Sequence, residues 1–220
     1  MGYAIWKYVH VLLLVFWIGT DLGVALLTRK FTDAKLSLET RLTLLQMALI
    51  IDTLPRIAFL VMLPVGLHLM AGLGIIPSDA LHLGAAWVIA LSLLAVNIAA
   101  AKNMGTPKGA KLQKLNWALL SVVGAVLIAL GAMGLMAADS KLPGWLATKM
   151  VLYGLVYFFA IGIDYGFAPL GGQIAELQES GSSPDLETRI QGTVRRTLFS
   201  VYGVYAGALL AALFGIGKFY

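Results

Sequence analysis

Three histidines and one lysine are the residues of this chain that could hold a metal or a cofactor. His10 lies in the apolar stretch "YAIWKYVHVLLLVFWIGTDLG" and His68 in "VGLHLMAG". His82 and Lys149 stand at or near the start of two further apolar stretches. Ionisable side chains are costly in hydrocarbon and usually mark a function there. Two imidazoles at equal depth on different helices could ligate one haem iron from opposite faces, and haem b needs no cysteine.

The composition indicates what kind of element must position these residues. The chain has 220 residues, of which 60% are hydrophobic and 12% charged, with a mean hydropathy of +0.87. Because a soluble domain is nearer a quarter charged, we expect a single integral membrane domain over residues 1–220. The first apolar stretch carries His10 and Asp21 and lacks a basic start, so we interpret it as a retained span and not as a signal peptide.

The chain has no cysteine and a formal net charge of +5. The missing cysteines exclude disulfides, thiolate metal sites, Cys-ligated iron–sulfur clusters and covalently attached c-type haem. Positive charge in a membrane protein is typical of cytoplasmic loops that contact anionic lipid. We therefore predict membrane lipid, and not nucleic acid, as the partner of this charge.

Six stretches are apolar over about the 20 residues that a helix needs to cross a bilayer. The sequence predicts an all-α membrane protein, a helical bundle with spans over residues 4–27, 51–74, 83–101, 117–137, 145–168 and 196–217. The stretch "LSLETRLTLLQMALI" before the second span is also helical in pattern. Pro55 and Pro64 are expected to kink that span.

The loops predict the orientation of the bundle. Loops 28–50, 102–116 and 169–195 are rich in Lys and Arg, whereas loop 75–82 has none and loop 138–144 has only Lys141. Because positive loops stay cytoplasmic, both termini are expected to lie outside. We predict a multi-pass protein of a bacterial inner membrane.

This orientation places all three histidines and Lys149 in the outer half. His10 and His68 each lie about two helical turns inside the outer end of their spans, some ~7–9 Å at about 1.5 Å per residue. His82, at the outer start of the third span, is a spare ligand. Lys149 could pair with the propionates of a haem. Lys7 could do the same, or extend to the membrane interface.

A second polar layer is expected in the inner half, made of Asp21, Asp52, Arg56 and Asp164. Asp52 and Arg56 are spaced as an i,i+4 pair and could satisfy each other locally. Two interpretations remain open for this layer. It could be buried polar packing between helices, or it could be a path for a proton or an ion toward the outer site.

Three pairs of glycines have the GxxxG spacing that allows close helix contact. They are Gly19–Gly23, Gly162–Gly166 and Gly203–Gly207. Asp21 and Asp164 each lie inside one of these motifs. Such faces could also join two copies of the chain, so a homo-oligomer is a possible assembly.

The first and fifth spans carry a resemblance to a known family. "WKYVHVLLLVFWIG" resembles the first helix of the copper-resistance protein D superfamily, which includes the haem-dependent membrane protoporphyrinogen oxidases of bacteria. "GWLATKMVLYG" is similar to the Trp-x3-Lys start of another helix there. The resemblance implies functional roles for His10 and Lys149. The chain differs from those oxidases in having more spans, and in the sequence "GTDLGVALLTRKF" after its first His.

Three functions follow from these residues. The leading one is a b-type haem protein with a redox or electron-transfer role. Its partner would be a quinone, a porphyrin or a redox protein. If it is an enzyme, it would be a membrane haem-dependent oxidoreductase. The second is copper handling, because Cu(I) prefers soft ligands and the outer half holds Met62, Met70, Met133, Met136 and Met150. The third is a transporter or assembly factor without a cofactor.

Overall fold

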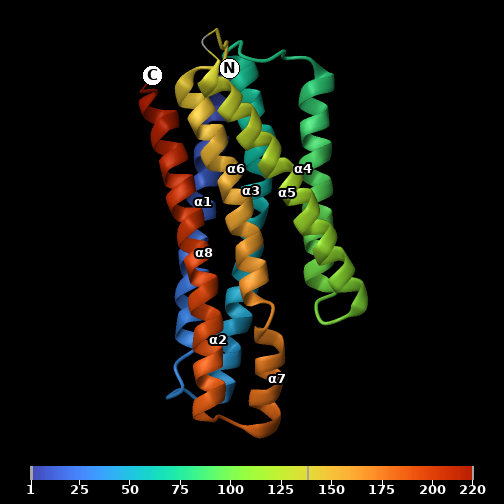
Figure 1. Ribbon diagram of the computed structural model, residues 1–220, viewed down its shortest axis with the longest axis vertical. Coiled ribbons are helices and arrows are strands. Elements are labelled where there is room, and N and C mark those ends of the chain that lie inside the picture. The colour runs from blue at the N-terminus through green and yellow to red at the C-terminus, as the bar shows by residue number, and fades with distance from the viewer. Residues whose placement is uncertain (1, 138, 220) are drawn as a thin grey trace.

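The computed structural model describes residues 2–137 and 139–219, and these residues form α-helices joined by short loops, without a strand (Figure 1). The helices in chain order are α1 (Gly2–Phe31), α2 (Leu38–Ile51), α3 (Thr53–Gly72), α4 (Ala80–Lys102), α5 (Pro107–Met136), α6 (Gly144–Phe167), α7 (Leu170–Ser180) and α8 (Pro184–Gly217).

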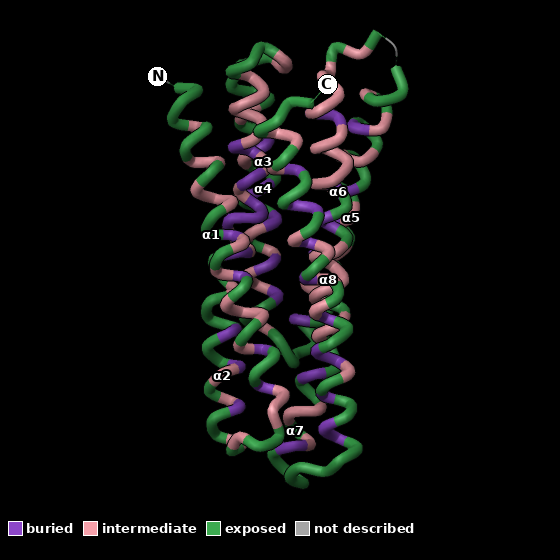
Figure 2. Tube along the Cα trace, turned by 90° about the vertical axis from the view of Figure 1, so that its left-hand side faces the viewer, coloured by how far each residue is buried: buried purple, intermediate pink, exposed green. Residues whose placement is uncertain are grey.

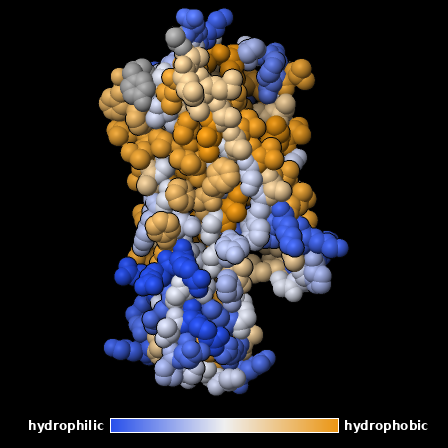
Figure 3. Space-filling model, in the orientation of Figure 1, coloured by the Kyte–Doolittle hydropathy of each residue, from blue (hydrophilic) through white to orange (hydrophobic). Residues whose placement is uncertain are grey.

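The predicted membrane bundle is confirmed. Six helical segments are long and apolar enough to cross a membrane: α1, α2 with α3, α4, α5, α6 with α7, and α8. Their apolar side chains form a band across the upper part of the face shown in Figure 3. Below this band, polar side chains gather over α7 and the lower part of α8 (Figures 1 and 3).

The first residues of α1 and the last residues of α8 lie at the same end of the bundle (Figure 1). We call this the outer end, and the opposite end, with α2 and α7, the inner end. The placement of both termini at one end agrees with an even number of spans. Which end faces the cytoplasm remains a prediction from the basic loops.

Several helices are longer than the spans that hydropathy predicts. The expected loop 102–116 is mostly the first part of α5, which Thr106 caps by accepting a hydrogen bond from the Gly109 N–H at 3.0 Å. The expected loop 169–195 contains α7, and α8 begins at Pro184 rather than at residue 196. A hydropathy window misses these segments because they are amphipathic helix beyond the apolar band.

The second predicted span, 51–74, corresponds to α3, and the helical stretch expected before it is the separate helix α2. Ser37 caps α2 by accepting from the Thr40 N–H at 3.2 Å, and the helix ends at Ile51. α3 then begins at Thr53, so Pro55 falls in its first turn, where the missing N–H of proline costs little. The expected kink at Pro55 is therefore a break at Asp52, whereas Pro64 lies inside α3.

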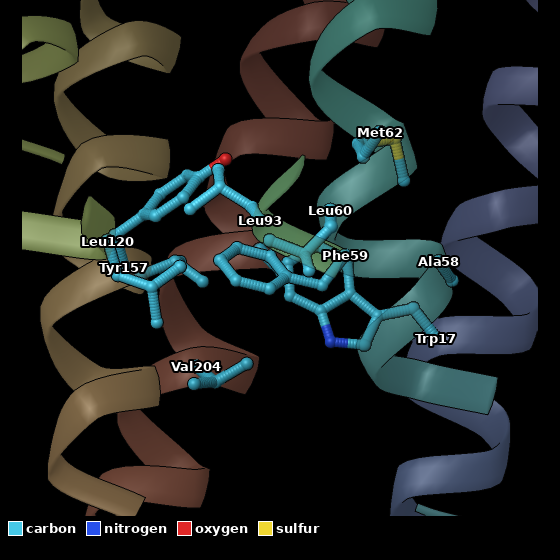
Figure 4. Close-up of a cluster of buried hydrophobic side chains, with 11 residues drawn as sticks. Trp17, Ala58, Phe59, Leu60, Met62, Leu93, Leu120, Tyr157 and Val204 are labelled. Atoms are coloured by element: carbon cyan, nitrogen blue, oxygen red, sulfur yellow. The ribbon is translucent and has the colours of Figure 1, made fainter. Parts of the chain in front are cut away.

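The helices pack in two neighbouring groups. α1 packs against α2 and α3, α6 packs against α5 and α8, and α4 lies between α3 and α5. Buried residues of α1, α3, α6 and α8 belong to one core cluster, and buried positions lie along the interior of the bundle (Figure 2). The centre of this core is aromatic, with the Trp17 and Phe59 rings 5.2 Å apart and the Phe59 and Tyr157 rings 4.6 Å apart (Figure 4).

A second, smaller core holds the inner end together. Its buried residues are Phe31, Leu45, Leu170, Leu177, Leu186 and Ile190. Beside them Arg41, only 2% exposed, donates two hydrogen bonds to the Glu187 carboxylate, at 2.7 and 2.9 Å, and one to the carbonyl of Phe31 at 2.8 Å. This core fixes α2 and α7 against the ends of α1 and α8.

Two of the three GxxxG motifs join helices within the chain. A side chain at Gly162 would collide with the Ser200 hydroxyl at 2.6 Å, and one at Gly207 would lie 2.6 Å from Cγ2 of Val156. α6 and α8 therefore approach closely along both glycine pairs. Gly19 and Gly23 have no neighbour within 4 Å of an added Cβ, so their face of α1 is open.

Candidate functional site

His10 faces α3 from the outer half of α1. The two helices run side by side in opposite directions, and the His10 Cε1 atom lies 3.6 Å from where a Cβ would stand on Gly66. The imidazole is half-buried, and its Nδ1 atom is buried without a hydrogen-bond partner among the described residues. Buried polar atoms are normally paired, so this nitrogen is the clearest sign of a missing partner in the outer half.

Lys149 enters the same region from α6. Its Nζ atom lies against α8, 2.7 Å from where a Cβ would stand on Gly215, and its charge is close enough to act on His10. No carboxylate pairs with Lys149 in the part of the chain that the structure describes. The structure thus brings together the two residues that the resemblance singled out, an imidazole and an ammonium group without a counter-ion.

His68 has different surroundings. Its Nε2 atom accepts a hydrogen bond from the Trp87 indole N–H at 3.0 Å, and its ring stacks on Trp6 with centroids 3.9 Å apart. Because Nε2 accepts, this imidazole is neutral with its proton on Nδ1. His68 is therefore already engaged by α1 and α4, and the arrangement favours one histidine ligand, His10, over a pair.

His82 and Lys7 lie outside this region. The side chain of His82 is 61% exposed, and its Nδ1 atom bonds the Asp79 carboxylate at 2.7 Å. Asp79 caps α4 by accepting from the N–H groups of Leu81 and His82, and the His82 N–H is the main cause of a lowered pKa of the Asp79 carboxyl. Lys7 is exposed. These two residues have surface roles in the structure.

No group of three or more His, Asp or Glu side chains that could hold a metal occurs among the described residues. A different arrangement stands near the outer end, where an open groove of about 380 Å³ runs between α3, α5 and α6. Met70, Met133 and Met150, one from each helix, line this groove. Met62 is buried in the core instead, and Met136 is 86% exposed.

An aromatic cluster lies in the middle of the bundle, inward of His10 and Lys149. Trp17 of α1, Phe59 of α3 and Tyr153 of α6 contact one another by their rings. The Tyr153 hydroxyl also donates to the backbone carbonyl of Phe59 at 2.6 Å. Tyr153, one turn from Lys149, therefore ties α6 to α3 at this level.

The four residues of the predicted inner layer do come together. Arg56 of α3 pairs with Asp52 at 2.5 Å and with Asp164 of α6 at 3.1 Å. Gln113 of α5 donates to the second oxygen of Asp164 at 2.8 Å. Asp21 of α1 lies beside this network and is only 8% exposed.

Sequence reasoning missed the partners of these groups. Nothing in the sequence singled out Trp6, Trp87 or Tyr205, and Gln113 stood in an expected loop. A useful signal was available for Trp6 and His10, which are spaced i,i+4 and therefore share a helix face. The others meet across helices, and no local spacing reports such contacts.

Comparison with protein-family models finds no match, and searches of curated proteins and of solved structures find none either. The resemblance to the copper-resistance protein D superfamily therefore rests on the two short motifs around His10 and Lys149.

Proposed function

We propose that this multi-pass membrane protein is a b-type haem protein of the bacterial inner membrane with a redox role. His10 would be the axial ligand, and Lys149 would neutralise a propionate or tune the redox potential. The observation that carries the proposal is the buried, unpartnered Nδ1 of His10 beside an ammonium group without a counter-ion. When bound, haem b supplies one-electron chemistry, while the protein sets its potential through ligand, burial and charge.

With His10 as its only protein ligand, a bound haem would remain accessible to a small molecule. That arrangement suits an oxidoreductase more than a pure electron carrier, for which two axial ligands are usual in b-type centres. A quinone or a porphyrin could reach the outer region from lipid, and a protein partner from the aqueous side. His68 would then act by packing Trp6 and Trp87 around the region and not by binding iron.

The haem content of purified variants tests this assignment. The protein would be produced with added haem, and bound haem would be quantified for the wild type, His10→Ala, His68→Ala and His82→Ala. We expect loss of haem in His10→Ala and retention in the other two. Loss in both His10→Ala and His68→Ala would indicate two histidine ligands, and a wild type without haem would contradict the proposal.

A second candidate function, copper handling, is favoured by the methionine-lined groove. Thioether sulfur is a soft ligand that suits Cu(I), and Met70, Met133 and Met150 converge there from three helices. Anaerobic Cu(I) titration against a competing chelator would test it. Met70→Leu and Met150→Leu should each weaken binding, while Met104→Leu, at the inner loop, should not. Equal affinity in all variants would remove the groove from consideration.

A further inference from the structure

The inner layer holds more negative than positive groups. Asp21, Asp52 and Asp164 stand around a single guanidinium, that of Arg56. If all three carboxyls were ionised, the layer would carry two uncompensated negative charges inside the membrane. Such charges are expensive unless they are paired, neutralised or bound to a cation.

The geometry identifies which carboxyl is left over. Arg56 makes its two ion pairs with Asp52 and Asp164, and Gln113 adds a hydrogen bond to Asp164. Asp21 is buried, with only 8% of its surface exposed, yet it has no cationic partner among the described residues.

A second unpartnered group lies beside Asp21. The hydroxyl of Tyr205, from α8, is next to this carboxyl. It is buried, and it has no hydrogen-bond partner of acceptable geometry in the described structure. The Tyr205 hydroxyl can donate a hydrogen bond to Asp21 whether the carboxyl is ionised or protonated. Only the protonated form also removes the negative charge that no cation compensates.

We propose that Asp21 is a proton-binding site of the inner half, with the Tyr205 hydroxyl as its neighbour. The groups that face it are Asp52 at the end of α2, Arg56 of α3 and Tyr205 of α8, and Asp164 of α6 is held to Arg56. One proton on Asp21 removes one negative charge and leaves Asp52 and Asp164 to share Arg56. The site needs no cofactor, so it does not depend on the haem assignment.

Asp21 lies in the inner half, one turn inward of Trp17, whose ring contacts Phe59 and Tyr153. We therefore expect a proton to reach Asp21 from the inner end. In the proposed haem protein, proton uptake at Asp21 in the inner half would accompany electron transfer at the haem in the outer half.

Infrared spectroscopy of the full-length protein in lipid nanodiscs tests the proposal. A protonated carboxyl has a C=O stretching band, separate from the carboxylate bands, that shifts on exchange into D2O. We expect this band in the wild type at neutral pH and its loss in Asp21→Asn. Asp79→Asn, at the exposed cap of α4, should keep it. In Tyr205→Phe the band should remain but move to higher frequency, because a hydrogen bond is lost.

Two outcomes would overturn the proposal. One is a wild type without the band at neutral pH, or with a band that survives in Asp21→Asn. The other is a band that appears only when Na⁺ is replaced by choline, because a sodium ion would then occupy the carboxyl. Asparagine has nearly the same shape as a protonated aspartic acid and is also uncharged, so we expect Asp21→Asn to fold as well as the wild type, which circular dichroism would verify.

Discussion

At the scale of single residues, the buried and partly buried polar side chains fall into two kinds. Arg41 is held by Glu187 of α8, and Arg56 by Asp52 just before its own helix and by Asp164 of α6, at distances between 2.5 and 3.1 Å. His10 and Asp21 lack such partners. A buried group with a complete set of partners stabilises the fold, whereas one without partners costs stability and is retained where it has a function. Function is therefore sought at His10 and Asp21.

The Arg41–Glu187 pair should be the most sensitive ion pair of the inner end. Glu187→Gln leaves the Arg41 charge buried without compensation, so we expect a loss of about 3–5 kcal/mol in the free energy of unfolding. Arg189→Ala is the matched control, because its pairs with Glu176 and Asp185 are exposed to solvent and should contribute little to stability. Thermal unfolding in detergent measures both. Equal losses would contradict the structural role of Arg41.

Substitution of Lys149 tests whether its charge sets the haem midpoint potential or whether the side chain only supports the fold. A positive charge near a haem favours the reduced form, so Lys149→Gln should lower the midpoint potential by on the order of 60 mV, about tenfold in the equilibrium of a one-electron couple. Lys149→Arg should keep the wild-type potential. Redox titration followed by visible absorption measures this. An unchanged potential in Lys149→Gln would place the ammonium group away from the haem.

At the scale of the helices, close packing decides which glycines matter. α6 and α8 interlock through Gly162, Gly166, Gly203 and Gly207, whereas Gly19 and Gly23 of α1 meet nothing. The GxxxG spacing alone did not distinguish these cases, because it reports a groove on one helix and not what fills it. The same limit applies to His68, whose depth was predicted but whose contact with Trp87 depends on the placement of α4.

Two glycine-to-alanine changes should therefore have opposite effects. A Cβ at Gly203 would collide with the Phe159 ring, so Gly203→Ala should destabilise the fold by about 1–3 kcal/mol. Gly19→Ala meets open space and gains helix propensity, so it should stabilise by up to about 1 kcal/mol. Unfolding of the two variants under identical conditions measures the difference. Destabilisation by Gly19→Ala would indicate that a second copy of the chain packs on this face.

The sequence predicts the elements of this fold better than their ends. Hydropathy located all six spans, because about 20 apolar residues have few other uses. It could not place α7 or the first part of α8, which are held by the small core around Phe31 and Ile190. For the site, it placed His10 and Lys149 in one layer. It could not predict that Trp87 donates a hydrogen bond to His68 or that Trp6 stacks on it, since those contacts arise only when three helices meet.

At the scale of the whole molecule, the apolar band and the polar inner end define how the protein sits in a membrane (Figure 3). The basic loops predict that the inner end is cytoplasmic. If so, His10 and Lys149 lie nearer the outside and Asp21 nearer the cytoplasm. Redox chemistry and proton binding would then occupy opposite halves of one bundle, on the two sides of the aromatic cluster.

Cysteine labelling tests this orientation cleanly, because the chain has no cysteine of its own. Ser78→Cys lies in the loop at the outer end, and Ser182→Cys in the loop before α8 at the inner end. In intact cells, a membrane-impermeant thiol reagent should label Ser78→Cys and not Ser182→Cys. After the cells are opened, both should react. Labelling of Ser182→Cys alone in intact cells would invert the topology.

The central claim is that the outer half of the bundle holds haem through His10. The most direct measurement is a reduced-minus-oxidised visible spectrum of the detergent-purified protein, recorded for the wild type and for His10→Ala after production with added haem. The account predicts a b-type α band in the wild type that is absent from His10→Ala. A wild type without any haem signal would contradict it, and would leave the methionine groove and a cofactor-free transporter as the functions to test.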